Sequence, residues 1–279
     1  MKKIDIHLHI PFDDTMGEMF STAEKMIPRL DELGISHGVL MSISPQWNEQ
    51  NMKTVEKYPD RFSWMYHAEP SLGGIMPQLM RAKARGAIGI GEITLNKLII
   101  EPFIQDLFLE AERLNMPVLF HMSPEEGYSY GIVDKPGLPL LEHCLQDYKK
   151  LKFIGHSQPF WHEITGDAAT GREDRNQWGN GPVKPGGRLV YLFEKYPNLY
   201  GDLSANSGGQ AIMRDEEFGL EFLHKYADRL FFGTDMLNTS MEFPLGKWLD
   251  DMHAKGRLSN DAYEKICWKN AEKLIKGEL

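Results

Sequence analysis

The stretch KIDIHLHI at residues 3–10 decides the fold prediction, because it combines an apolar, strand-length pattern with polar side chains toward its end. His7 and His9 are two residues apart, so on a β-strand their side chains project from the same face. The apolar residues around them project from the opposite face, toward covering helices: Ile6, Leu8 and Ile10. The pattern predicts a strand that gives an apolar face to a helix layer and two imidazoles to a polar centre.

Seven further apolar runs of strand length follow this stretch, with segments of helical spacing between them. The eight runs lie at residues 3–10, 37–43, 61–68, 87–93, 117–123, 152–157, 198–204 and 230–236. Such alternation is typical of a parallel sheet covered by helices. In a chain of 279 residues it predicts one α/β domain over residues 1–279, a TIM-type (β/α)8 barrel.

Capping signals support the predicted helices. Ser21 followed by Glu24 predicts a capping box at the start of the first helix, and Gly34 stands where that helix would end. Ser259 is the expected N-cap of the final helix. Residues 157–187 have little apolar periodicity, and a loop of this length is usually functional or disordered, so we expect it on the active face.

Composition and charge exclude several functional classes. Hydrophobic residues make up 42% of the chain, yet no apolar run approaches the roughly 20 residues that a membrane helix requires. The net charge is −9, and no cluster of Lys or Arg could neutralise a phosphate backbone, so we expect no nucleic-acid partner. Lys2 and Lys3 are not followed by the continuous apolar core of a signal peptide, which predicts a cytoplasmic protein.

The chain has two cysteines, Cys144 and Cys267, and each falls in a partly apolar segment with helical spacing. We expect buried thiols in a reducing compartment, without a catalytic role.

Polar residues occur late in several predicted strands. In a (β/α)8 barrel the active site is built at the C-terminal ends of the strands, so these side chains are expected to converge. The converging residues are His7, His9, Glu92, His121, His156 and Asp235. Imidazoles and carboxylates crowded together are costly without a cation, which predicts a divalent metal.

The same regions carry a family resemblance. The chain resembles the amidohydrolase superfamily, and within it the amidohydrolase-2 branch that includes amino-carboxymuconate-semialdehyde decarboxylase. The motifs that carry the resemblance are HLH, YPDRF, FH, GH, YPNLYGDLS, RLFFGTDM and NAEKL, in this order along nearly the whole chain. The resemblance implies that His7, His9, His121 and Asp235 are metal ligands, and that His156 binds a second metal or polarises the bound water. It also implies that Asp235 acts as acid/base and that the protein forms a homodimer.

Glu92 departs from that branch, because GEITLN at residues 91–96 resembles the TatD-like hydrolases, in which such a glutamate bridges two metals. One alternative is a bridged pair of ions, with the histidines of the first strand on one side and His121 and His156 on the other. The other alternative is that Glu92 only accepts a hydrogen bond from a ligand histidine. The nitrogen and oxygen donors suit Zn²⁺, which we expect, and also Mn²⁺ or Fe²⁺, as one ion or two.

Candidate substrate-binding residues lie near the same face. Trp161, Arg172 and Arg175 belong to the loop after His156, and arginines beside a metal suggest a bound carboxylate. Two further residues on the expected active face are Trp47 and His67.

Three functions remain open at this point. The first is hydrolysis of a small, carboxylate-bearing ester, lactone or amide by a metal-activated water. The second is non-oxidative decarboxylation of an aromatic or unsaturated acid, and the third is ligand binding without turnover. We favour the hydrolase, because a site with both His156 and Glu92 suits water activation, and we expect a small-molecule substrate.

Overall fold

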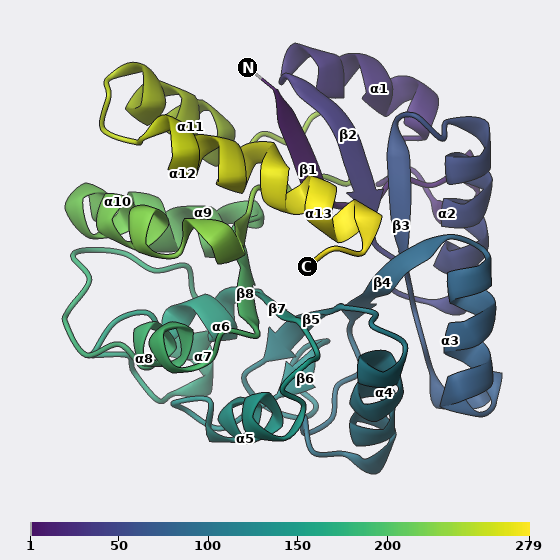
Figure 1. The fold of residues 1–279 in the computed structure, drawn as a ribbon, viewed down its shortest axis with the longest axis horizontal. Helices are drawn as coiled ribbons and strands as arrows, with labels where there is room; N and C mark the ends of the chain where they lie inside the picture. The colour runs from purple at the N-terminus through teal and green to yellow at the C-terminus, as the bar shows by residue number, and fades with distance from the viewer. Residues whose placement is uncertain (1) are drawn as a thin grey trace.

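The computed structural model describes residues 2–279, and its central feature is a barrel of parallel strands (Figure 1). The strands pair in the order β1-β2-β3-β4-β5-β7-β8-β9, and the short β6 pairs with β5. Their bounds are β1 (Lys3–Leu8), β2 (Ile35–Leu40), β3 (Phe62–Tyr66), β4 (Ala87–Ile93), β5 (Val118–Ser123), β6 (Ile132–Val133), β7 (Phe153–His156), β8 (Leu199–Asp202) and β9 (Leu230–Phe231). All eight predicted runs contribute a strand, which confirms the predicted (β/α)8 fold class.

The barrel closes between β1 and the chain that follows β9. The backbone N–H of Ile6 donates to the carbonyl of Phe232 at 3.1 Å, and that of Asp235 donates to the carbonyl of His7 at 2.9 Å. Closure therefore brings Asp235, near the end of the chain, directly beside the histidines of β1.

Helices surround the strands in Figure 1, and the C-terminal helix α13, in yellow, crosses one end of the barrel. The helices are α1 (Ala23–Glu32), α2 (Pro45–Lys57), α3 (Ile75–Ala84), α4 (Pro102–Arg113), α5 (Pro139–Asp147), α6 (Gln158–His162), α7 (Arg172–Arg175), α8 (Arg188–Lys195), α9 (Ala205–Met213), α10 (Glu216–Lys225), α11 (Leu245–Ala254), α12 (Asn260–Glu264) and α13 (Asn270–Lys276). Short 3-10 turns lie at Asp14–Met16 (η1), Pro70–Leu72 (η2) and Ala227–Arg229 (η3), and a π-helical turn at Lys265–Lys269 (η4) joins α12 to α13. Within residues 2–279, no helix has both the length and the apolarity needed to cross a bilayer.

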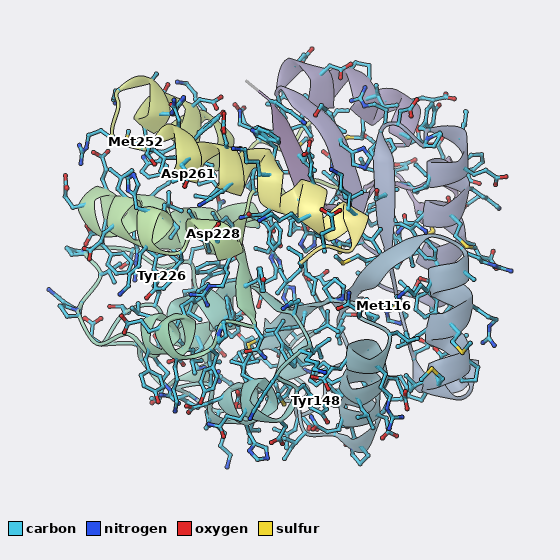
Figure 2. All side chains as sticks on the ribbon, viewed as in Figure 1. Met116, Tyr148, Tyr226, Asp228, Met252 and Asp261 are labelled. Atoms are coloured by element: carbon cyan, nitrogen blue, oxygen red, sulfur yellow. The ribbon has the colours of Figure 1, made fainter. Side chains whose placement is uncertain are left out.

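The apolar core has two parts, one between the strands and the helices and one inside the barrel. In the outer part, the ring of Tyr148 packs edge-on against Phe108 of α4 with centroids 5.9 Å apart, and Figure 2 labels Tyr148 between α4 and α5. The inner part takes side chains from nearly every strand and is closed by Ala271 and Leu274 of α13. Its strand members include Ile4, Ile6, Val39, Met65, Leu119, Ile154, Tyr200 and Phe231.

Ile6 packs inside the barrel, whereas strict alternation predicts that it faces the helices with Leu8. The prediction for Ile6 is wrong because the pairing of β1 with β2 shifts register between Asp5 and Leu8. Such an irregularity changes which face consecutive side chains occupy. His7 can therefore point to the polar centre although its neighbour Ile6 lies in the inner core.

The helix-end predictions are confirmed in part. Ser259 caps α12 by accepting the N–H of Ala262, and Gly34, just past α1, has φ +73°. The predicted capping box is wrong, because α1 begins after Thr22 and the Ser21 hydroxyl accepts the N–H of Thr239.

The two cysteines are buried and unpaired, as expected. Burial raises the pKa of Cys144 to about 11 and that of Cys267 to about 12.

Candidate active site

The six residues predicted to bind metal lie together at the C-terminal ends of their strands. Their ligand atoms form three overlapping groups of three. Within each group, the three atoms lie within 4.8 Å of one another. The groups are His7, His156 and Asp235; His7, His9 and Glu92; and Glu92, His121 and His156. Five of the six residues are buried, so this is an enclosed polar centre in an otherwise apolar barrel.

The two histidines of the HLH motif point at each other and at the carboxylates. The Nε2 atoms of His7 and His9 are 3.2 Å apart. The Nε2 of His9 lies 3.3 Å from Oδ1 of Asp235 and 3.6 Å from Oε2 of Glu92. Two imidazole nitrogens at this separation compete for one proton or converge on one cation.

Asp202, which the sequence analysis did not select, holds two of these histidines. Its Oδ2 accepts the Nδ1–H of His7 at 2.7 Å and lies 3.1 Å from Nδ1 of His156. Ser204 donates to the same oxygen at 2.7 Å and lies 3.0 Å from Nδ1 of His156. With Nδ1 engaged in this way, each ring presents Nε2 to the centre of the site.

Glu92, at the end of β4, lies between two pairs of histidines. Its Oε2 is 3.6 Å from His9 Nε2 and 3.7 Å from His7 Nε2. Its Oε1 accepts the Nδ1–H of His121 at 2.7 Å and is 3.9 Å from Nε2 of His156. One carboxylate thus faces both sides of the cluster.

Asp235 is the most accessible of the six, with 27% of its side chain exposed. Its backbone has φ +61°, a left-handed conformation that Asp tolerates better than most residues. Oδ1 is 3.5 Å from Nε2 of His7, and Oδ2 is 3.9 Å from Nε2 of His156. This carboxylate therefore faces both the imidazoles and the solvent-accessible pocket.

Neighbouring groups of the cluster shift one another's pKa. Burial opposes ionisation, but the carboxylates of Asp235 and Asp202 raise the pKa of His7 well above its usual value. Burial likewise opposes ionisation of Glu92, yet His121 and His7 lower its pKa well below the usual range. The pKa of Asp235 is also lowered against its burial, chiefly by His7. The carboxylates are ionised and attract positive charge to the point where the imidazoles meet.

This donor set fits a divalent cation. Four imidazoles and two carboxylates supply the nitrogen and oxygen ligands that such ions take in proteins. Nδ1 of His9 is a buried polar atom without a hydrogen-bond partner among the described residues. The histidines and carboxylates that converge here could hold one ion, or two with Glu92 between them.

A pocket of about 430 Å³ opens beside the cluster. His9, Glu92 and Asp235 form its floor. Its walls are Met19, Phe20, Ile43, Thr94, Tyr130, Leu237 and Met241.

Comparison with known proteins places the chain in a family. A family model described as amidohydrolase matches residues 101–276, which contain Asp235 and the last two histidines of the cluster. The chain belongs to the amidohydrolase family. This confirms the resemblance, whereas the TatD-like role of Glu92 stays a prediction. No curated protein matches the sequence.

Solved structures share the fold of this amidohydrolase. A probable 2-pyrone-4,6-dicarboxylic acid hydrolase from Acinetobacter baumannii, with citric acid bound, is 16% identical over 99% of this chain and 100% of that chain, with a TM-score of 0.59. The 5-carboxyvanillate decarboxylase from Sphingomonas paucimobilis is 13% identical over 99% of each chain, with a TM-score of 0.64. A 5-carboxyvanillate decarboxylase from Novosphingobium aromaticivorans, with bound manganese, is 18% identical over 91% of this chain and 81% of that chain, with a TM-score of 0.60.

None of the five predicted substrate residues lines the pocket of this amidohydrolase, and three of them are engaged elsewhere. Trp161 is buried in the core, where its indole N–H donates to the carbonyl of Asp202 at 2.9 Å. Arg175 is only 2% exposed and donates to the carbonyls of Pro124 and Asp134. Arg172 is exposed and lies 3.3 Å from Glu125.

The long loop follows His156 at the C-terminal end of β7, and its Arg175 contacts Pro124 just past the end of β5. None of the described residues 157–187 lines the pocket. The loop folds into α6 and α7, and Trp161 and Arg175 attach it to the barrel. Neither Arg172 nor Arg175 lines the pocket, and the bound carboxylate expected from them stays a prediction.

Trp47 and His67 lie behind the site. Trp47 is buried, with its ring edge-on to His9 at 5.9 Å and to Phe20 at 5.0 Å between centroids. His67 is buried at a second, very small cavity that Glu92 also borders. Neither residue lines the 430 Å³ pocket.

Tyr130 is a pocket residue that sequence reasoning missed. Its ring lies over His121 with centroids 4.3 Å apart, and its side chain is among the exposed large hydrophobics. It precedes β6, a strand of two residues that carries no periodic signal in the sequence. Arg175 accounts for its position, because the guanidinium binds the carbonyls of Pro124 and Asp134, which flank this segment on both sides.

Proposed function

We propose that this amidohydrolase is a metal-dependent hydrolase that uses a metal-activated water on a small ester, lactone or amide. The observation that carries the proposal is the position of Asp235, an ionised carboxylate that faces both the imidazole cluster and the pocket. An acid/base placed between a cation site and a substrate pocket suits proton transfer from water to a leaving group.

The proposed ligands of one ion are His7, His9 and Asp235, and a second ion would take His121 and His156, with Glu92 shared. Zn²⁺ is the proposed metal, and Mn²⁺ is the alternative, since manganese is bound in one decarboxylase of the same fold. When bound, such an ion lowers the pKa of a water ligand toward neutrality and polarises a carbonyl oxygen.

The chain's own groups have separate tasks in this proposal. Asp235 takes a proton from the water and returns it to the leaving group, since its carboxylate faces both the imidazole cluster and the pocket. Asp202 and Ser204 hold the rings of His7 and His156 through Nδ1. Tyr130 offers a neutral hydroxyl on the pocket wall, where it can donate to a substrate oxygen.

Decarboxylation is the second candidate, because proteins of the same fold include decarboxylases of carboxyvanillate. Asp235 would then deliver a proton to the carbon that loses carbon dioxide. Decarboxylation has less need of a carboxylate shared between two ion sites, and Glu92 faces histidines on both sides. We therefore favour hydrolysis over decarboxylation.

The deciding experiment incubates Zn²⁺- or Mn²⁺-loaded protein with a panel of aryl esters, lactones and amides, and separately with aromatic and unsaturated acids. Acid release from the first panel, lost in Asp235→Asn, is the expected result. Carbon dioxide release from the second panel with no hydrolysis of the first would reverse the order. Asp228→Asn, an exposed carboxylate on η3, is the matched control.

Metal content tests the shared role of Glu92. We expect two ions per chain at full activity, and at most one in Glu92→Gln. Full activity with one ion per chain, unchanged by excess metal, would overturn the bridged arrangement and leave Glu92 as a hydrogen-bond acceptor for His121.

A further inference from the structure

The walls of the 430 Å³ pocket carry no cation. Among the described residues that line it, none is Lys or Arg, and its charged groups are the two carboxylates on the floor, Glu92 and Asp235. Five of the seven wall residues have purely apolar side chains: Met19, Phe20, Ile43, Leu237 and Met241. The polar wall groups are the neutral hydroxyls of Thr94 and Tyr130.

Cations on the neighbouring loops are engaged elsewhere. Lys97 lies 3.4 Å from Glu126, and Arg172 lies 3.3 Å from Glu125. Arg175 is buried against two backbone carbonyls, outside the pocket. A second anionic group on a bound substrate would therefore meet apolar walls without a charged partner.

Burying a carboxylate that has no charged or hydrogen-bonding partner is costly. An apolar part of the substrate, in contrast, gains free energy when it leaves water and contacts these walls. Two of the exposed large hydrophobic residues, Met19 and Tyr130, lie at this pocket, and each is 60% exposed. A patch of exposed apolar groups often marks a ligand site. A volume of about 430 Å³ is within the usual range for small-molecule sites.

We propose that the substrate carries one polar group, at the reacting centre, and that the rest of it is uncharged and apolar. The inference rests on the proposed function, because it names the substrate class of the same site. It replaces the carboxylate-bearing substrate that the sequence suggested. Flexible methionine side chains at Met19 and Met241 suit an alkyl or aryl group of variable shape.

The test measures binding, so that it is independent of turnover. Calorimetry on the Zn²⁺-loaded protein compares hexanohydroxamate with a hydroxamate of the same chain length that ends in a carboxylate. Both probes share the metal-binding group and differ only at the far end. We expect the alkyl probe to bind at least about tenfold tighter, since the carboxylate finds no partner in the pocket.

Two variants, each of which replaces an exposed methionine by lysine, test whether the preference comes from the pocket wall. Met19→Lys puts a cation on the pocket wall and is expected to shift the preference at least about fivefold toward the carboxylate probe. Met80→Lys, on α3 and 57% exposed, lies outside the pocket and is expected to leave the preference unchanged.

Equal or tighter binding of the carboxylate probe to the unmodified protein would overturn the inference. Equal shifts in Met19→Lys and Met80→Lys would also overturn it, because the effect would then come from overall charge. If the alkyl probe binds preferentially but no ester, lactone or amide is hydrolysed, the proposed function fails and the inference about the pocket is supported.

Discussion

The Nδ1–H of His7 donates to Oδ2 of Asp202 at 2.7 Å, and both side chains are fully buried. The two residues are 195 positions apart in the chain. Because Nδ1 is engaged, Nε2 of His7 is the nitrogen that faces His9, Glu92 and Asp235. The contact therefore decides which atom of His7 is available to a metal.

Replacing Asp202 is expected to weaken the metal site. In Asp202→Asn the amide can donate to Nδ1, which favours the tautomer with its proton on Nε2 and removes that ligand atom. Loss of such a supporting carboxylate typically costs about 10–100-fold in metal affinity. Competition with a chromogenic chelator measures the affinity, and Asp228→Asn is the control. Unchanged affinity in Asp202→Asn would show that His7 is oriented by other groups.

Metal removal is expected to lower thermal stability. An ion that binds only the folded chain adds about 2.7 kcal/mol when its free concentration is 100 times Kd. For a chain of this size that corresponds to a fall in Tm of about 4–6 °C on chelation. Thermal scans with and without EDTA measure it. The double variant His7→Asn/His9→Asn should lose most of the difference, and an equal difference in that variant would place the ion elsewhere.

The two arginines of the long loop are expected to behave differently. Arg175→Met leaves the buried carbonyls of Pro124 and Asp134 without donors and should lower the free energy of unfolding by about 2–4 kcal/mol. Arg172→Met removes an exposed ion pair and should change it by less than about 1 kcal/mol. Urea denaturation measures both. A large activity loss in Arg172→Met with normal stability would instead support a substrate-binding role for Arg172.

Tyr130→Phe is expected to lower kcat/KM by about tenfold, the value of one neutral hydrogen bond to substrate, without a change in stability. Tyr128→Phe is the matched control, because its hydroxyl donates to Glu173 and does not line the pocket. Steady-state kinetics on the best substrate of the panel measures the effect. Equal losses in the two variants would argue for a general effect of the loop.

Glu142 gives a pH-dependent contribution to stability. Burial opposes ionisation, but hydrogen bonds from Tyr196, Lys195 and Arg188 lower its pKa to about 2. A carboxyl whose folded pKa lies below its unfolded value stabilises the fold above the unfolded pKa, about 4.3. This stabilisation is lost as pH falls from about 5 toward 2.

The stability difference between the unmodified protein and Glu142→Gln should therefore narrow below pH 5, as measured by urea denaturation from pH 7 to pH 3. High salt should reduce the difference at pH 7, since the ion pairs are partly exposed. A difference that is constant over this pH range would contradict the assignment.

The sequence by itself determined the barrel and the members of the polar cluster. Apolar runs separated by helical segments predict parallel strands, and parallel strands of a closed barrel bring their C-terminal ends to one place. His7, His121 and Asp235 could therefore be grouped without knowing any contact. Their positions late in each run carried the information.

Only the tertiary structure decided which groups support the cluster and which line the pocket. Asp202 falls late in its strand as well, but its role depends on the distances to His7 and His156. Arg175 has the residue type expected of an anion site, yet long-range packing buries it against backbone carbonyls. Ile6 faces the inner core because β1 shifts register. Periodicity encodes burial along one element, whereas loop paths and register shifts depend on contacts between residues far apart in the chain.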